Sequence, residues 1–181
     1  MARRVRAYVG LGSNVGDTRA NLRNAVRAMS ALPGVAVRRV SHAYMTRPVG
    51  VADQPDFLNA VVALDVPRGR SPETGALALL AGTKQIETAL GRQKRQRWGP
   101  REIDLDLLVF GRHQLDTGEP DGLWLKVPHQ SARERLFVLA PLADLAPRLS
   151  PPGWHETVET ARRRQANFEG EDAIQPVGTI D

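Results

Sequence analysis

The chain of 181 residues contains no cysteine, so no disulfide framework can stabilise it. A domain of this size can bury a substantial core without disulfides, and the absence of cysteine suits a reducing cytoplasm. No stretch reaches the roughly 20 apolar residues that a membrane-spanning helix needs. The first 14 residues are basic and then briefly apolar, but glycines interrupt them far short of a secretory signal core. We therefore expect a soluble protein of the cytoplasm with no membrane partner.

Acidic residues are missing from residues 92–101, and this stretch instead gathers five positive charges: Arg92, Lys94, Arg95, Arg97 and Arg101. The formal net charge of the whole chain is +5, so the remainder is close to balanced. A protein that coats nucleic acid would spread its positive charge further. A concentrated cluster suits a compact polyanion such as a nucleoside triphosphate.

Internal repeats and low-complexity linkers are also absent, which argues against two domains. We expect a single domain over residues 1–164. The last stretch, residues 165–181, is polar and aperiodic, and we expect it to be a loosely attached tail.

Apolar periodicity and turn residues predict the secondary structure. Strands are expected at residues 5–11, 35–45, 57–66 and 103–110. Helices are expected after Asp17 and after Ser71, which are both typical N-caps, and Gly91 is placed to end the second of them. A hairpin of residues 114–115 and 123–127 and short helices at residues 137–142 and 155–164 follow. The order predicts an α+β fold with a ferredoxin-like sheet, antiparallel or mixed, covered by helices in three α/β/α layers.

Two aspartates, Asp104 and Asp106, stand one residue apart in the clearest of these strands. Side chains two apart share a face of a strand, with α-carbons roughly 6.6 Å apart. Such a pair can hold one or two hard cations, and Mg²⁺ ions held in this way can clamp a displacement at phosphorus. The alternative is an amphipathic strand with one wet face. Strict alternation would put Leu108 and Phe110 beyond the acids on the same face, so both faces look buried there.

Several other features allow two interpretations. The basic loop could be a solvated surface, but its position beside the acid pair favours phosphate binding. Trp98 could anchor that loop in the core or close over a nucleotide as part of a lid. Asn59, on the same strand face as Phe57, could be a satisfied core residue or could recognise a flat heterocycle. The segment GLGSNVG at residues 10–16 has neither the G-x-G-x-x-G spacing nor the lysine of a phosphate loop, and we interpret it as a tight turn.

Taken in order, the blocks GLGSNVGD, YMTRPVG, DQPDFLNAV, IETALGR, WGPREIDLDLLVFG, LKVPH and ERLFVLAPL make the chain resemble the 6-hydroxymethyl-7,8-dihydropterin pyrophosphokinases of folate biosynthesis. The resemblance runs from Val5 to about Pro147. It implies that ATP and hydroxymethyl-dihydropterin give AMP and the pterin diphosphate, with the substrate hydroxyl attacking the β-phosphorus.

The resemblance also implies roles for individual residues. Asp104 and Asp106 would hold two Mg²⁺ ions and, with Arg92 and Arg101, form the catalytic set. The pterin ring would lie between Phe57 and Phe137 and be read by Asn59 and by the backbone near Thr46, Pro48 and Val49. ATP would meet Glu87, Arg92, Trp98, Arg101, His129 and Arg135. The family often has tyrosine where Phe57 stands, and phenylalanine keeps the stacking surface. We expect the enzyme to be a monomer that binds no nucleic acid.

Two other classes of function remain open on the residues alone. The first is a ferredoxin-like module that binds RNA or DNA through the basic loop, although RNA-binding sheets of this kind display a run of aromatics that is missing here. The second is a metal-dependent nuclease.

Overall fold

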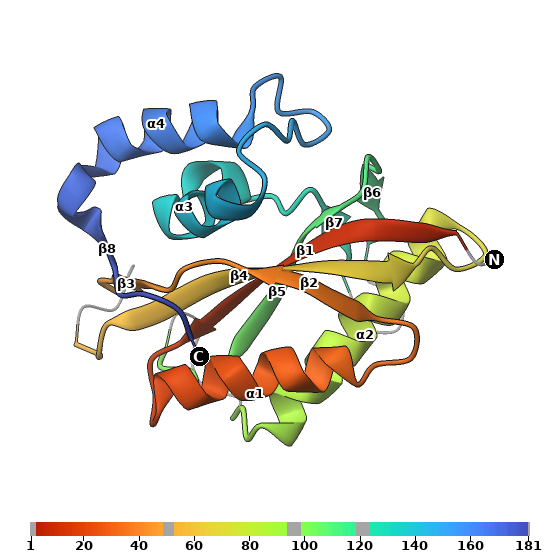
Figure 1. The fold of residues 1–181 in the computed structure, drawn as a ribbon, viewed down its shortest axis with the longest axis horizontal. Coiled ribbons are helices and arrows are strands. Elements are labelled where there is room, and N and C mark those ends of the chain that lie inside the picture. The colour runs from red at the N-terminus through yellow and green to blue at the C-terminus, as the bar shows by residue number, and fades with distance from the viewer. Residues whose placement is uncertain (1–2, 49–52, 94–98, 119–123, 181) are drawn as a thin grey trace.

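The fold is seen in a computed structural model that describes residues 3–48, 53–93, 99–118 and 124–180. One sheet forms the middle layer, with a pair of helices on each face (Figure 1). Its strand order is β5-β1-β4-β3-β8, and β2 also pairs with β4. The strands are β1 (Arg4–Ser13), β2 (Ala36–Val40), β3 (Tyr44–Thr46), β4 (Phe57–Pro67), β5 (Asp104–Phe110) and β8 (Ile174–Pro176). Every pairing among them is antiparallel, which confirms the predicted ferredoxin-like sheet and the three layers.

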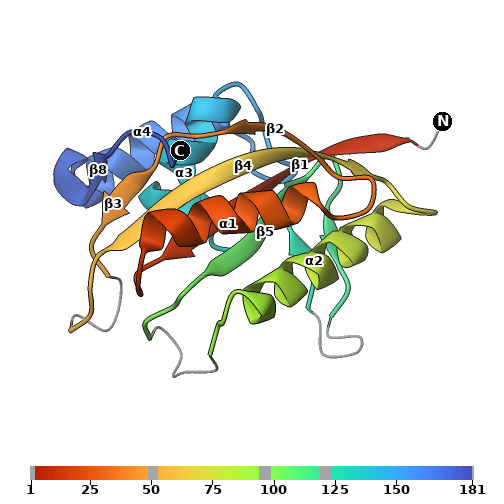
Figure 2. The ribbon, with the colours of Figure 1, turned by 60° about the horizontal axis from the view of Figure 1, so that its bottom comes forward.

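The helices α1 (Thr18–Ser30) and α2 (Pro72–Ala89) lie side by side across one face of the sheet (Figure 2). Both begin at the predicted caps. The carboxylate of Asp17 accepts a hydrogen bond from the Ala20 backbone N–H at 2.9 Å, and Ser71 forms a reciprocal capping box with Thr74. Gly91 follows α2 with a positive φ of 86°, the conformation in which glycine commonly ends a helix.

The opposite face is covered by α3 (Leu136–Leu145) and α4 (Val158–Glu169). Short 3₁₀ turns precede α3 at Ala132–Glu134 and follow α4 at Glu171–Ala173. The predicted hairpin is present as β6 (Leu115–Asp116) paired with β7 (Lys126–Val127). The two faces carry separate apolar cores, one under each helix pair. None of the helices in the described ranges has both the length and the apolar character to cross a lipid bilayer.

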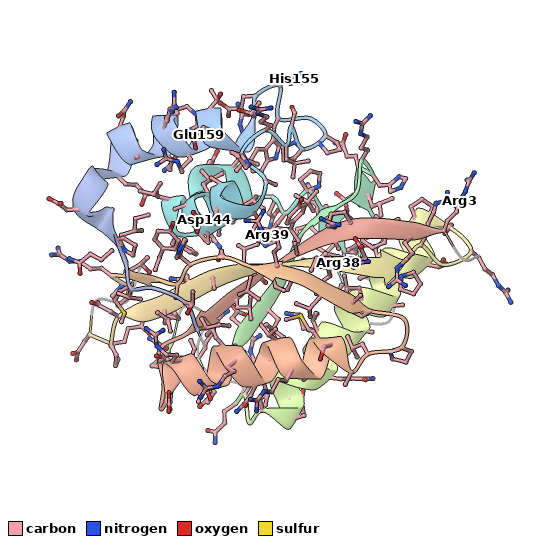
Figure 3. All side chains as sticks on the ribbon, viewed as in Figure 1. Arg3, Arg38, Arg39, Asp144, His155 and Glu159 are labelled. Carbon is pink, nitrogen blue, oxygen red and sulfur yellow. The ribbon has the colours of Figure 1, made fainter. Side chains whose placement is uncertain are left out.

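Asp144, near the end of α3, fastens this helix layer to the edge of the sheet. Its carboxylate accepts hydrogen bonds from the Tyr44 hydroxyl at 3.0 Å and from the His42 backbone N–H at 3.1 Å. Arg39 of β2 donates to the Asp144 carbonyl at 3.3 Å, and Figure 3 shows Arg39 and Asp144 at this junction. Burial and the negative charge of Asp144 raise the pKa of Tyr44 to about 12, so the phenol stays a hydrogen-bond donor at neutral pH.

The prediction of one strand over residues 35–45 is wrong, because the segment is broken into β2 and β3. Ser41, at the break, donates its backbone N–H to the Val61 carbonyl at 2.9 Å, and its hydroxyl accepts from the Val61 N–H. The Ser41 hydroxyl thus accepts the hydrogen bond that a backbone carbonyl accepts in a regular strand pair. The bounds of the two late helices were also predicted wrongly: α3 extends to Leu145 instead of ending at residue 142, and α4 lies at Val158–Glu169 instead of residues 155–164.

The loosely attached tail is also wrong for the described residues. Residues 165–169 form the last turns of α4, and β8 pairs with β3 over Tyr44–Thr46. The Ala43 N–H donates to the Gly178 carbonyl at 2.7 Å, and Ile180 is 2% exposed in the core under α1 and α2. The segment is held by backbone hydrogen bonds and one buried apolar side chain, and a polar composition does not reveal either of them.

The prediction that side chains alternate strictly between the two faces of β5 is wrong as well. Tyr8 of β1 stands opposite Val109, and Val9 stands opposite Leu107, so Leu108 has no counterpart on β1. This extra residue is a β-bulge, which reverses the alternation beyond it. Val109 therefore packs with Leu108 under α3 and α4, and Phe110 packs on the opposite face.

Candidate active site

A cavity of about 760 Å³ lies between the sheet and the α3/α4 layer. Its size falls within the range of small-molecule sites in proteins. The sheet supplies the floor, the segment before α3 supplies one wall, and α3 and α4 supply the other. The lining includes Gly10, Gly12, Thr46, Phe57, Asn59, Val61, Arg101, Asp104, Asp106, Leu108, His129, Arg135, Phe137, Gln165, Phe168 and Glu169.

The register of the sheet explains why these floor residues come together. Gly12 of β1 stands opposite Asp104 on one side and Asn59 on the other, and Gly10 stands opposite Asp106. Directly opposed residues share a face, so acids and amide line the same floor. A Cβ at Gly12 would lie 3.1 Å from the Asn59 Oδ1 atom, which is tighter than ordinary contact. The glycines therefore keep the middle of the floor open.

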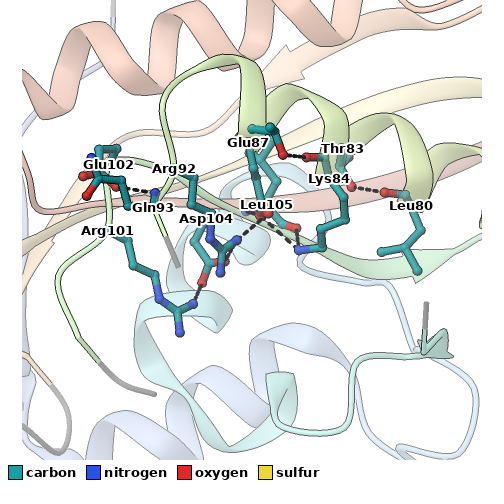
Figure 4. A network of polar contacts seen from close by, with 11 residues as sticks. Leu80, Thr83, Lys84, Glu87, Arg92, Gln93, Arg101, Glu102, Asp104 and Leu105 are labelled. Atoms are coloured by element: carbon teal, nitrogen blue, oxygen red, sulfur yellow. Dashed lines mark hydrogen bonds and ion pairs between the residues drawn. The ribbon is translucent and has the colours of Figure 1, made fainter. Parts of the chain in front are cut away.

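Asp104, the first residue of β5, is held by two arginines (Figure 4). Its carboxylate pairs with Arg92 at 2.8 Å and with Arg101. Burial alone would raise the pKa of Asp104, but Arg101 and Arg92 outweigh it and hold that pKa below its ordinary value. Asp104 is therefore fully ionised at neutral pH and locally neutralised.

Glu87 of α2 forms the base of this network. It is 3% exposed and accepts hydrogen bonds from the Leu105 N–H at 2.6 Å and from Lys84 Nζ at 3.0 Å. It also pairs with Arg92. Burial raises the pKa of Glu87 even though Lys84 and Arg92 oppose the shift. Glu87 joins α2 to β5 and holds Arg92, and it does not itself line the cavity.

Asp106 lies in a different environment from Asp104. Among the described residues it has no ion pair or hydrogen-bond partner, although it lines the cavity from the same face of β5. Burial, and then the charge of Asp104, raise the pKa of Asp106 above its ordinary value. A half-buried carboxylate without a protein partner carries an uncompensated desolvation cost, and a cation would relieve that cost.

His129 is attached to β5 at the bulge. Its backbone N–H donates to the carbonyl of Leu108, the bulged residue, at 2.8 Å. Its Nδ1 atom accepts from the Ser131 N–H at 3.3 Å, so the ring is held from two sides. Burial lowers the pKa of His129, although the negative charge of Asp106 opposes this shift. The lowered pKa favours the neutral imidazole.

At the other end of the cavity lies a group of uncharged side chains, Thr46, Phe57, Asn59 and Phe137, which we call the neutral end. Asn59, which is 6% exposed, donates from Nδ2 to the Thr46 hydroxyl at 2.8 Å. Phe57 stands opposite Thr46 in the sheet, and Phe137 lies across the cavity at the start of α3. The Arg135 guanidinium carbon is 5.7 Å from the centre of the Phe137 ring. Two aromatic rings and a fixed amide suit a flat, polar heterocycle.

The structure brings most of the predicted site residues together. Those that line the cavity are Thr46, Phe57, Asn59, Arg101, Asp104, Asp106, His129, Arg135 and Phe137. Pro48 and Arg92 lie outside the lining, although Arg92 contacts Asp104. Val49 and Trp98 fall outside the described residues.

Asn14, in the segment interpreted only as a turn, is a supporting residue that the sequence reasoning missed. Its Nδ2 atom donates to the Pro55 carbonyl at 3.0 Å and to Gln54 Oε1 at 3.1 Å. Its Oδ1 atom accepts from the Arg101 N–H at 2.8 Å. Asn14 thus joins the loop before β4 to the loop before β5. A polar residue directly after a buried strand was the signal available.

Three residues of α4 were also missed: Gln165, Phe168 and Glu169 line the cavity. They lie in residues 165–181, which were predicted to form a loosely attached tail.

The chain is similar to known proteins over most of its length. The family model of 7,8-dihydro-6-hydroxymethylpterin-pyrophosphokinase matches residues 8–147. The 2-amino-4-hydroxy-6-hydroxymethyldihydropteridine pyrophosphokinase of Methylorubrum extorquens is 46% identical over 86% of this chain and 90% of its own length. The enzyme of the same name from Bacillus subtilis is 45% identical over 77% of each chain.

A crystal structure of an HPPK-DHPS in complex with substrates has a similar fold, with a TM-score of 0.77 at 11% identity. The alignment covers 96% of this chain and 48% of that one, so the chain spans about half the length of that protein.

Proposed function

The chain belongs to the 7,8-dihydro-6-hydroxymethylpterin-pyrophosphokinase family and transfers pyrophosphate from ATP to hydroxymethyldihydropterin in folate biosynthesis, and we propose that the cavity is its active site. The observation that carries this proposal is the contrast between Asp104, which is paired with arginines, and Asp106, which has no partner among the described residues. Both acids face a cavity whose far end is aromatic.

The donor set at the acid end fits Mg²⁺. We propose that Asp104 and Asp106 hold two Mg²⁺ ions, which supply charge neutralisation for the phosphates of ATP when bound. The described residues contain no group of three or more potential metal ligands. Water and phosphate oxygens would complete the coordination, as Mg²⁺ commonly requires.

The arginines exchange partners when the substrates bind. Arg92 and Arg101 neutralise Asp104 in the absence of ligand. With Asp104 holding a cation, both guanidinium groups would be available for phosphate oxygens, which they recognise well. Glu87 keeps Arg92 at this position during the exchange. His129 and Arg135 would contact ATP from the loop and turn that precede α3.

The pterin would occupy the neutral end, with its ring between Phe57 and Phe137. Asn59 is oriented by Thr46, which leaves the Asn59 Oδ1 atom to accept a hydrogen bond from the ring. This end holds the ring so that the hydroxymethyl group points toward the aspartates. Positioning of two substrates in this way can lower a barrier by several kcal/mol.

The products test the reaction. Purified protein with ATP, Mg²⁺ and the dihydropterin should form AMP, and omission of the pterin or addition of EDTA should stop AMP formation. Formation of ADP, or turnover that is independent of pterin, would contradict the reaction. Calorimetric titration of Mg²⁺ into the protein with a non-hydrolysable ATP analogue should give a stoichiometry of two if both aspartates hold ions.

We also propose that the enzyme acts as a monomer in the cytoplasm, with no nucleic acid or membrane partner. Light scattering of the purified protein, with and without substrates, measures the oligomeric state. Cell fractionation measures the location.

A further inference from the structure

The C-terminal helix α4 contacts the first turn of α3 at the cavity wall. The Glu169 Oε1 atom accepts hydrogen bonds from the Leu136 backbone N–H at 3.1 Å and from Gln165 Nε2 at 2.8 Å. Arg135, the N-cap residue of α3, makes no side-chain capping hydrogen bond. A carboxylate near a helix N-terminus satisfies a backbone donor and interacts favourably with the helix dipole. Glu169 therefore caps α3 from a different helix.

The capped residue lies between two residues of the proposed site. Leu136 is buried, and its neighbours Arg135 and Phe137 line the cavity. Because Leu136 connects them directly, any shift of its backbone moves both side chains. The capping hydrogen bond thus fixes one contact for each substrate, the guanidinium for ATP and the ring for the pterin.

A second contact holds the same segment from α4. Arg164 donates from Nη2 to the Arg133 carbonyl at 3.0 Å. Both arginines also pair with Glu156, at 3.3 Å and 2.6 Å. The chain around the start of α3 is therefore attached to α4 at two points, Arg133 before the helix and Leu136 at its first residue. Downstream, β8 fixes the chain after α4 to the edge of the sheet.

We propose that Glu169 is a positioning residue for both substrates, acting through the N-terminus of α3. It lies outside residues 8–147, which the family model matches. The proposal rests on the proposed location of the active site. Glu169 adds no chemistry to the transfer. Its effect is on how well the ligand-free protein presents Arg135 and Phe137.

The purely structural alternative makes a different prediction. If Glu169 only stabilised the packing of α4, its loss would lower the melting temperature but leave the KM values of the folded protein unchanged. A positioning role changes the KM values measured well below the melting temperature. Replacement of Glu169 by glutamine removes the charge but keeps an oxygen acceptor, so it should restore the position of α3.

The experiment compares Glu169→Ala, Glu169→Gln and the control Glu159→Gln. Glu159 lies on the same helix, and its ion pairs within the described ranges are with Arg162 and Arg163 of that helix. In Glu169→Ala we expect KM to rise about fivefold to tenfold for both ATP and the pterin, because one hydrogen bond to α3 is lost. Glu169→Gln should stay within about twofold of the wild type, and Glu159→Gln should leave both KM values unchanged.

Two results would overturn the proposal: unchanged KM values in Glu169→Ala, or equal rises in Glu169→Ala and Glu159→Gln. If the alanine variant does not fold, Glu169→Asp replaces it, because its shorter side chain draws the carboxylate away from Leu136. Unchanged KM values in folded Glu169→Asp would also overturn the proposal. Wild-type AMP production in the same assay reports separately on the reaction.

Discussion

The two ends of the cavity are built by different forces. At the acid end, Asp104 is held by ion pairs with arginines, and Asp106 has no such partner among the described residues. At the neutral end, Asn59 is fixed to Thr46 by a hydrogen bond between uncharged groups, and the walls are aromatic. The neutral end is already arranged for its ligand. In the proposed function, the arginines at the acid end would exchange Asp104 for phosphate when ATP binds.

This difference assigns different kinds of selectivity to the two ends. Ion pairs in a wet cleft are exchanged easily, since surrounding water and incoming phosphates compete for both partners. A buried amide and two rings cannot rearrange without loss of packing. The acid end should therefore respond to charge and salt, and the neutral end to the shape of the ligand.

The largest expected effect is loss of the acids. Asp104→Ala and Asp106→Ala should lower turnover by at least about 10³-fold, because phosphate charge would no longer be neutralised by bound cations. Steady-state AMP formation measures the effect, and circular dichroism checks that both variants are folded. Near-normal turnover in either variant would contradict the metal role of that residue.

The next effect concerns the neutral end. Phe57→Ala should raise KM for the pterin by about 10-fold to 100-fold, because the pterin ring loses one of its two stacking surfaces. KM for ATP should change little. Phe57→Tyr, which keeps the ring, is the matched control and should stay close to the wild type. An equal change in both KM values for Phe57→Ala would show that the two ends are not separate.

Ionic strength offers a test without mutation. Raising potassium chloride from about 50 mM to about 0.5 M should raise KM for ATP several-fold, because salt screens contacts between arginine and phosphate. KM for the pterin should remain nearly constant, since its proposed contacts with Phe57, Phe137 and Asn59 are uncharged. A parallel rise in both would count against a division of the cavity by charge.

The smallest effect is on stability in EDTA. Asp104→Asn should lower the melting temperature by about 2 °C to 4 °C, and Asp106→Asn should raise it by a similar amount. The signs follow from the pKa values. Burial opposes ionisation of both acids, but arginines hold the pKa of Asp104 low, whereas the pKa of Asp106 is raised.

The pH dependence of the same two variants separates the signs further. The ionised carboxylate of Asp104 stabilises the folded state at neutral pH, and that contribution is lost as pH falls through its lowered pKa. Above its raised pKa, Asp106 is ionised and destabilises the folded state. The gain in melting temperature from Asp106→Asn should therefore disappear as pH falls. Calorimetric melting curves between about pH 3 and pH 7 measure both. If Asp104→Asn and Asp106→Asn shifted the melting temperature in the same direction at pH 7, opposite pKa shifts of the two aspartates would be contradicted.

Local features of the sequence were sufficient to predict much of the fold. Asp17 and Ser71 predicted their helix starts because capping depends on a few neighbouring residues. The two-residue repeat placed Asp104 and Asp106 on one face, and the register confirms it. The resemblance, rather than spacing, supplied the partners of these residues across the cavity.

Other features depend on partners distant in the sequence. The bulge at Leu108 exists only relative to β1, and nothing in the β5 segment alone marks it. Gln165 is buried although it lies in a polar run, because α4 turns it toward α3. The pairing of β8 with β3 joins residues about 130 positions apart through backbone groups, which side-chain patterns do not encode. Such contacts are settled by tertiary packing.

The pairing of β8 with β3 has a consequence for the order in which the protein is made. The aspartates, Phe57 and Phe137 all leave the ribosome before α4 and β8 do. Until β8 emerges, β3 presents backbone groups that another chain could pair with, a known route to aggregation. During synthesis, therefore, the interval between the emergence of β3 and that of β8 is a period in which β3 lacks the strand that pairs with it in the folded protein.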